Sequence, residues 1–89
     1  MEGQPRKVYA TVKTIAGTQA PRAIRFEGQT FLELKARLMA ANLPGAAEDS
    51  FLEIRDDAGE FVCLLDQDGL PQGDLYVNVH NYSVGRLRS

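Results

Sequence analysis

The chain contains one cysteine, Cys63, and one histidine, His80, the residue types that serve as thiol nucleophile and as the most frequent general base. A catalytic thiolate needs a base positioned beside it, and His80 is the only histidine that could supply one. His80 stands beside Asn81 near the end of the last predicted strand, where a single histidine is more often a surface residue than a general base. We therefore expect no catalytic residue and a protein that is not an enzyme.

The segment Asp66-Gln67-Asp68-Gly69 contains carboxylates and a glycine of the kind found in calcium-binding loops. An EF-hand loop also needs a further oxygen ligand before the glycine and a glutamate several residues after it, and residues 70–74 contain no glutamate. Gly28 stands alone before Thr30, so the chain lacks a glycine-rich phosphate loop there. We therefore expect no metal ion, no cofactor and no small-molecule substrate.

The chain has 89 residues, enough for one small domain, and 44% of them are hydrophobic and 25% charged. These fractions are typical of a globular protein and argue against overall disorder. The single cysteine excludes a disulfide framework and points to a reducing compartment. The first seven residues lack the apolar stretch of a signal peptide, and no apolar run is long enough to cross a membrane. We therefore predict a cytoplasmic protein that does not enter the membrane.

The formal net charge of −2 argues against general nucleic-acid binding, yet the two halves of the chain differ in sign. Residues 1–44 hold seven of the ten basic and three of the twelve acidic side chains, a balance of +4. Residues 45–89 hold three basic and nine acidic side chains, a balance of −6. A chance distribution of a few charges is the alternative to a functional polarity.

The first secondary-structure signal is an alternation of small apolar residues, Val8, Ala10 and Val12, with more polar neighbours from Lys7 to Lys13. A period of two predicts a strand with one buried face. The polar residues 16–20 around Gly17 predict a turn, and a second alternation puts Ile24 and Phe26 on one side of the next strand. Together these signals predict an antiparallel hairpin.

A capping box predicts the start of a helix at Thr30. The Thr30 hydroxyl can accept a hydrogen bond from the backbone N–H of Glu33, and the Glu33 carboxylate can accept one from the backbone N–H of Thr30. The helical spacing of Phe31, Leu34, Leu38 and Ala41 predicts the stripe that faces the core. Pro44 disfavours helical geometry in the residue before it, so we expect a helix of about thirteen residues.

Three later strands follow the helix, at residues 51–55, 60–64 and 75–79, with a turn at 57–59 and a loop at 66–74. The predicted fold is therefore α+β, in the order β-β-α-β-β-β, with one helix packed on a mixed sheet of four or five strands. The predicted domain covers residues 5–80, and residues 81–89 are expected to form a flexible C-terminal tail.

This arrangement resembles the β-grasp fold of ubiquitin, and three ubiquitin-like families share motifs with the chain. The acidic segment from Ile54 to Leu64, continued by Asp66, Asp68 and Leu70, is similar to the acidic motif of Phox/Bem-type domains. The lysine of that family's first strand, which a glycine follows, corresponds to Lys13 before Gly17, and Arg22 and Arg25 lie in the second strand. This resemblance implies head-to-tail pairing of a basic front with an acidic back.

The other two resemblances lie in the last strands. Residues 59–64 and 73–77 resemble the corresponding part of doublecortin-type domains, which implies binding to microtubules. Leu64-Leu65, Asp68, Leu70 and residues 75–77 are similar to the ubiquitin-like N-terminal domain of the kinetoplastid flagellar-pocket-collar scaffold. A conjugated ubiquitin-type modifier would end in two glycines, whereas the segment 84–89 holds one. We therefore expect that the chain as it stands is not such a modifier.

The candidate partner-binding residues are the charged side chains of the two hairpins. The basic set lies on the first hairpin: Lys7, Lys13, Arg22 and Arg25. The acidic set is expected around the later hairpin: Asp56, Asp57, Glu60, Asp66 and Asp68. In a β-grasp sheet the two hairpins form opposite edges, so the charge polarity of the sequence becomes a polarity of the molecule. Charges that merely keep two edges solvated are the alternative.

These residues predict a non-catalytic docking or oligomerisation module of a larger scaffold or signalling protein, whose partner is another protein or a second copy. Complementary charges would orient the contact. The alternative function is a microtubule-binding domain of doublecortin type, associated with the cytoskeleton. If the charges do not carry the contact, an apolar patch around Tyr9, Cys63 and Tyr76 on the sheet face is the other candidate surface.

Overall fold

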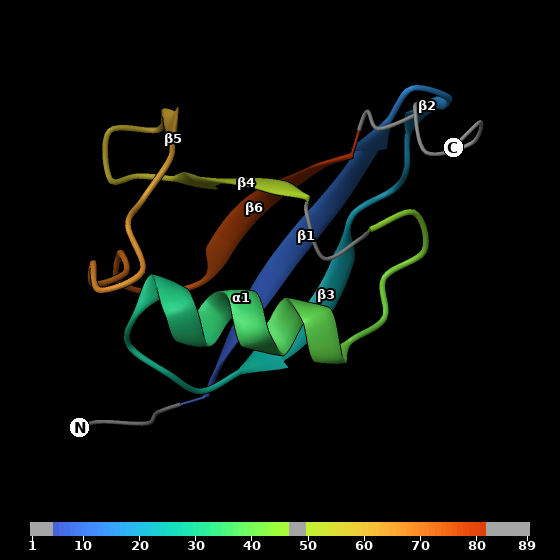
Figure 1. Cartoon of the computed structure of the whole chain (residues 1–89). Coiled ribbons are helices and arrows are strands. Elements are labelled where there is room, and N and C mark those ends of the chain that lie inside the picture. Colours follow the sequence, from blue (N-terminus) through green and yellow to red (C-terminus); the bar gives the residue numbers. More distant parts are fainter. Residues whose placement is uncertain (1–4, 47–49, 82–89) are drawn as a thin grey trace.

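The computed structural model describes residues 5–46 and 50–81, which form one helix and six strands. In chain order the elements are β1 (Arg6–Thr14), β2 (Gly17–Thr18), β3 (Arg22–Phe26), α1 (Phe31–Ala40), β4 (Phe51–Arg55), β5 (Phe61–Val62) and β6 (Leu75–Asn81). The predicted class is confirmed, because one helix lies on a mixed sheet (Figure 1).

The strands form a single sheet with β1 and β6 at its centre. The order across the sheet is β2-β1-β6-β4-β5, and β3 pairs with the same side of β1 as β2 does. β1 and β6 are parallel, whereas the other pairs are antiparallel. The sheet has six strands rather than the four or five predicted, because Gly17 and Thr18 pair with the end of β1 before β3 begins. A polar segment expected to be only a turn thus adds a short strand.

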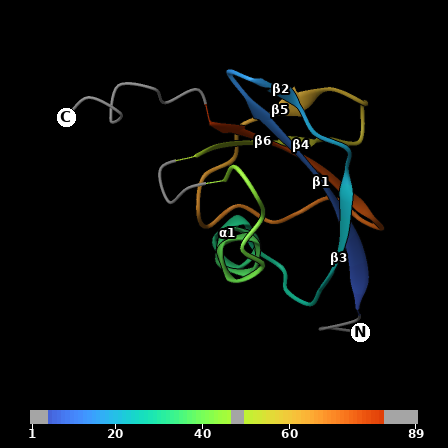
Figure 2. The same ribbon diagram turned by 90° about the vertical axis from the view of Figure 1, so that its right-hand side faces the viewer.

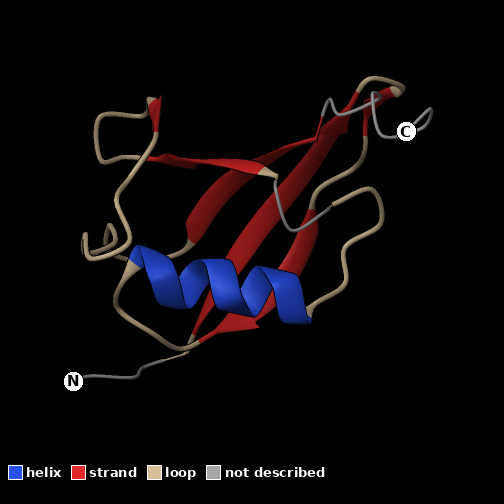
Figure 3. Cartoon of the chain, viewed as in Figure 1, coloured by secondary structure: helices blue, strands red, loops and turns tan. Residues whose placement is uncertain are grey.

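Helix α1 covers one face of the sheet, as the views in Figures 2 and 3 show. The predicted core-facing stripe of the helix is buried at Phe31, Leu34 and Leu38. These three residues belong to one hydrophobic cluster with buried residues of β1, β3, β4 and β6. The buried hydrophobic residues are Val8, Ala10, Val12, Ile24, Phe26, Phe31, Leu34, Leu38, Leu43, Ile54, Leu75, Val77 and Val79. Leu52, Val62 and Leu64 of the predicted strands 51–55 and 60–64 are only partly buried and pack against this core.

The predicted capping box is present at the start of α1. The hydroxyl of Thr30 accepts a hydrogen bond from the backbone N–H of Glu33 at 3.3 Å, and the carboxylate of Glu33 accepts from the backbone N–H of Thr30 at 3.0 Å. The helix is shorter than the thirteen residues expected, because Asn42 leaves helical geometry with a φ of +53°. Leu43 still packs in the core, now as part of the loop that follows α1.

Two of the predicted strand ends also differ. β5 comprises two residues instead of the expected 60–64, because the chain turns away after Val62 toward the N-terminus of α1. β6 continues through Asn81, whose side-chain amide donates a hydrogen bond of 2.7 Å to the carbonyl of Gly45. The last strand therefore extends beyond the predicted domain boundary at residue 80. The rest of the predicted tail, residues 82–89, lies outside the described residues.

Arg6 holds the long loop between β5 and β6 against the base of the sheet. Its guanidinium donates hydrogen bonds to the carbonyls of Pro71 and Gly73 in this loop, and to that of Gly28 before α1. The same guanidinium lies over the ring of Phe26, 5.9 Å from the ring centroid. One side chain thus ties the first strand to two distant loops.

Candidate protein-interaction surface

The basic residues predicted for partner binding lie on and beside one edge of the sheet. Lys7 of β1 lies directly opposite Arg25 of β3, and Arg22 is exposed at the start of β3. Lys13 is half-buried further along β1, between Thr18 of β2 and His80 of β6. Lys7, Lys13 and Arg25 alternate with the buried residues of β1 and β3, so they point away from the core. Arg22 is exposed, although its partner across β1 and β3 is the buried Ala10.

The acidic residues at the turn between β4 and β5 lie at the opposite edge. One oxygen of the Asp56 carboxylate accepts hydrogen bonds of 2.9 Å from the backbone N–H groups of Ala58 and Glu60, so Asp56 shapes the turn. Gly59 has a φ of +87°, a value that glycine adopts without a steric penalty. The exposed side chains of Asp57 and Glu60 are therefore the acidic groups that this turn presents to a partner.

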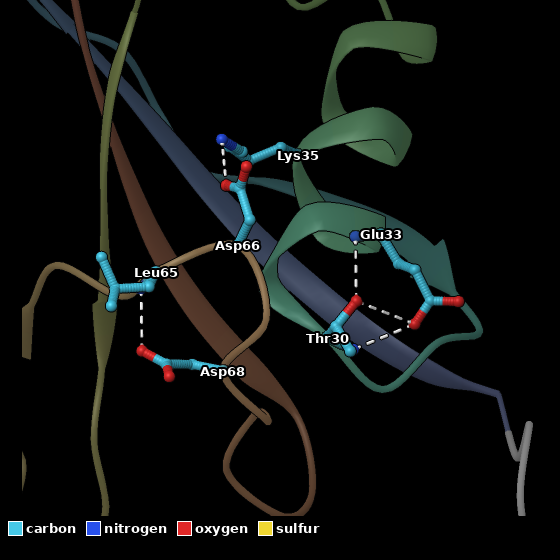
Figure 4. Close-up of polar contacts among 6 residues, drawn as sticks. All are labelled: Thr30, Glu33, Lys35, Leu65, Asp66 and Asp68. Carbon is cyan, nitrogen blue, oxygen red and sulfur yellow. Dashed lines mark hydrogen bonds and ion pairs between the residues drawn. The ribbon is translucent and has the colours of Figure 1, made fainter.

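Asp66 and Asp68 do not belong to this acidic turn; they lie beside the N-terminus of α1 (Figure 4). Their backbone carbonyls accept hydrogen bonds of 3.0 Å from the N–H groups of Leu32 and Phe31, respectively. The Asp66 carboxylate is ion-paired to Lys35, and the Asp68 carboxylate accepts from the backbone N–H of Leu65 at 2.8 Å. Both residues thus form hydrogen bonds or ion pairs within the fold. The prediction that they join Asp56, Asp57 and Glu60 around the later hairpin is therefore wrong.

The opposite face of the sheet from α1 carries a row of aromatic side chains, of which the sequence suggested only Tyr9 and Tyr76. These two rings stack with a centroid distance of 5.2 Å and an interplanar angle of 18°. The guanidinium of Arg55 lies 5.4 Å from the centroid of the Tyr76 ring. Phe61 is paired with Arg55 across β4 and β5 and is 42% exposed. The four side chains border a hollow of about 190 Å³, which Thr11 and Asn78 also line.

His80 and Glu53 form a second group on the same face of the sheet. The His80 Nε2 and the Glu53 Oε1 are 2.8 Å apart, and the ring of Phe51 is tilted against the imidazole. The hydrogen bond from His80 holds the pKa of the Glu53 carboxyl below its usual value, although partial burial opposes this shift. The group is an interaction between neighbouring strands, because Phe51 and His80 are paired across β4 and β6.

Cys63 is the remaining residue that the sequence offers for chemistry. Cys63 is exposed just after β5, where the chain has left the sheet. Within residues 5–46 and 50–81, no three histidine, cysteine or acidic side chains are grouped as a metal site would require. In the same part of the chain, no helix is both long and apolar enough to cross a membrane. A second hollow, of about 240 Å³, lies between α1 and β4 and is lined mostly by apolar side chains.

Comparison with known proteins identifies no relative of this chain. No protein-family model matches the chain, and neither the curated proteins nor the solved structures gave a match. The functional argument therefore depends on where the charged and aromatic side chains lie.

Proposed function

We propose that this chain is a non-catalytic protein–protein interaction module, used for docking or oligomerisation within a larger scaffold or signalling protein. We also propose that its fold is a ubiquitin-like β-grasp. The order of the elements supports this assignment, as does the parallel pairing of β1 with β6 between an N-terminal hairpin and the β4–β5 hairpin.

The observation that carries the functional proposal is the separation of charge across the sheet. Lys7, Arg22 and Arg25 lie at or next to the β3 edge, whereas Asp57 and Glu60 lie at the turn leading to the β5 edge. Within the described ranges the ion pairs are Lys35–Asp66 and His80–Glu53, so none of these five side chains is paired to a described charge. Their charges are available to a partner.

Opposite charges on opposite edges suit a head-to-tail contact, in which the basic edge of one copy meets the acidic turn of the next. Such a contact uses two different surfaces of the same molecule, and it leaves one edge of each kind free at the ends of the assembly. Complementary charges speed association and fix orientation more than they add affinity. The contact would therefore weaken as salt screens it.

Charge reversal at each edge tests this function by sedimentation velocity. Arg25→Glu and Asp57→Lys should each reduce self-association about tenfold or more, because like charges would then meet across the contact. The fold should tolerate Arg25→Glu, since the new carboxylate lies opposite Lys7. Ala40→Lys changes the charge on the exposed side of α1 and serves as the control. If neither Arg25→Glu nor Asp57→Lys reduces self-association, the proposal is contradicted.

A second function is favoured by the basic side chains that share the uncovered face. Lys7, Lys13, Arg25 and Arg55 all belong to strand positions on this face. A basic face could bind the acidic surface of a microtubule, which is the doublecortin-type function. Co-pelleting with microtubules that Lys7→Glu abolishes and Asp57→Lys strengthens would favour this function. Both functions place the protein in the cytoplasm, and the second places it on the cytoskeleton.

A further inference from the structure

The face of the sheet that α1 leaves uncovered presents an aromatic surface, which we call the open-face patch. It consists of Tyr9, Arg55, Phe61 and Tyr76, together with the hollow that they border. Tyr76 and Phe61 are each more than two-fifths exposed. Aromatic side chains and arginine are the residue types most enriched among the energetically important positions of protein interfaces. The patch therefore has the composition of a binding site.

The patch is preformed by its own contacts. Tyr76 lies on β6 between Tyr9 of β1 and Arg55 of β4, so its ring is stacked on one neighbour and contacted by the guanidinium of the other. Strand pairing fixes all three backbones, because β6 is hydrogen-bonded to both β1 and β4. A surface that is already ordered loses little side-chain freedom when it binds.

The charges on this face favour an anionic occupant. It carries four basic side chains, those of Lys7, Lys13, Arg25 and Arg55, and none of them is ion-paired to a carboxylate within the described residues. Two carboxylates close to this face are already engaged: Glu53 is hydrogen-bonded to His80, and Asp74 accepts from the backbone N–H of Lys7 at 3.3 Å. An acidic partner would supply the missing counter-charges.

We propose that the open-face patch binds an acidic peptide segment of another protein, with an aromatic side chain in the hollow and a carboxylate on Arg55. This inference rests on the proposed function and names the partner chemistry and a second contact surface. A hollow of about 190 Å³ is smaller than the roughly 300–1,000 Å³ of small-molecule sites, and it suits one inserted side chain. The guanidinium of Arg55 can bind a carboxylate through two parallel hydrogen bonds.

A single-stranded nucleic acid is the other anionic polymer that uses aromatic and basic side chains. Two observations disfavour it here. The ring of Tyr76 is already contacted by Tyr9 and Arg55, which limits its use as a platform for a base. The acidic turn, with Asp57 and Glu60, follows directly after Arg55 and would repel a chain of phosphates. A short peptide with its charges at one end avoids that turn.

A titration of the ¹⁵N-labelled chain followed by NMR tests the proposal. The probe is an acetylated and amidated pentapeptide, Phe-Gly-Asp-Glu-Asp, whose charges lie at one end, and the matched controls replace its phenylalanine with alanine or its acids with lysine. The acidic aromatic peptide should shift the amide signals of Tyr9, Arg55, Phe61 and Tyr76 with saturation. Each control peptide should bind about tenfold more weakly or less. Ten-residue oligothymidine is titrated in parallel.

Variants of the protein assign the site. Tyr76→Ala and Arg55→Glu should each weaken the peptide about tenfold or more, whereas Leu32→Ala, an exposed apolar site on α1, should leave its affinity unchanged. Phe61→Ala provides a second aromatic variant in case Tyr76→Ala unfolds, which the amide spectrum reports directly. No saturable shift up to about 5 mM peptide, shifts confined to the hollow between α1 and β4, or tighter binding of oligothymidine would each overturn the proposal.

Asp57→Lys separates this inference from the proposed function. It should reduce head-to-tail association about tenfold or more while leaving peptide binding intact or stronger, because it removes a negative charge near the patch. Head-to-tail association without peptide binding would overturn the open-face patch alone. Peptide binding without any effect of the edge charges on self-association would overturn the head-to-tail contact alone.

Discussion

The Nε of Arg37 on α1 donates a hydrogen bond of 2.8 Å to the backbone carbonyl of Arg25 on β3. β3 is an edge strand, so this carbonyl points away from β1 and would otherwise be open to another strand. The helix that closes the core thus also occupies a backbone acceptor at the sheet edge. This contact discourages uncontrolled strand pairing at the edge that carries the basic residues.

Replacing Arg37 should therefore weaken the fold and expose the β3 edge. We expect Arg37→Ala to lower the free energy of unfolding by about 0.5–1.5 kcal/mol, the usual net value of one hydrogen bond. Urea denaturation measures this loss, with Ala36→Ser on the exposed side of the same helix as the control. An Arg37→Ala variant as stable as the parent chain would show that this contact adds no stability.

The capping box makes part of the stability depend on pH. Hydrogen bonds from the backbone N–H of Gln29, and then from Thr30, hold the pKa of the Glu33 carboxyl below its usual value. A carboxyl whose pKa is lower in the folded chain stabilises the fold above its unfolded pKa, about 4.3, and loses this contribution as the pH falls through the folded pKa. Stability should therefore decline in acid through this group.

Glu33→Gln tests this dependence, because the amide oxygen can still accept a hydrogen bond but does not titrate. Between about pH 5 and pH 3 the stability of Glu33→Gln should fall less steeply than that of the parent chain. Thr30→Ala, which removes the other half of the box, should cost about 0.5–2 kcal/mol at neutral pH. Identical pH profiles for Glu33→Gln and the parent would contradict the assignment.

Leu38 tests the packing of the helix on the sheet. It is 5% exposed, and Leu38→Ala should cost about 2–5 kcal/mol through lost burial and the cavity that remains. Leu32, on the same helix, is 53% exposed, so Leu32→Ala should cost much less. Thermal denaturation of the pair measures the difference. Equal melting temperatures for the two variants would mean that α1 does not pack as described.

Local sequence signals were sufficient for much of the fold. The alternation of Val8, Ala10 and Val12 specifies which face of β1 is buried, and Thr30 with Glu33 marks the start of α1. Both signals depend on neighbours within a few residues. The end of α1 is set locally, by the left-handed φ of +53° at Asn42, a residue type that often ends helices, whereas the prediction relied on Pro44. The end of β5 was less predictable, because the loop that follows it is hydrogen-bonded to the distant N-terminus of α1.

The candidate surfaces depend more strongly on such distant contacts. Asp66 and Asp68 look like members of an acidic cluster in sequence, but their loop crosses to α1, some thirty residues earlier in the chain. The stack of Tyr9 on Tyr76 likewise requires the parallel pairing of β1 with β6. Charge patterns and strand parity indicate which side chains face outward; the pairing of strands decides which of them meet.

The head-to-tail contact can be tested most directly by mixing two charge-reversed variants. Arg25→Glu loses a basic residue but keeps the acidic turn, whereas Asp57→Lys loses an acidic residue but keeps the basic edge. Each variant alone should sediment as a monomer at concentrations where the parent chain associates. Their equimolar mixture should form a one-to-one dimer that dissociates when salt is raised from about 0.05 to about 0.5 M. A mixture that stays monomeric where the parent chain associates, or a parent chain that never associates, would contradict the head-to-tail contact.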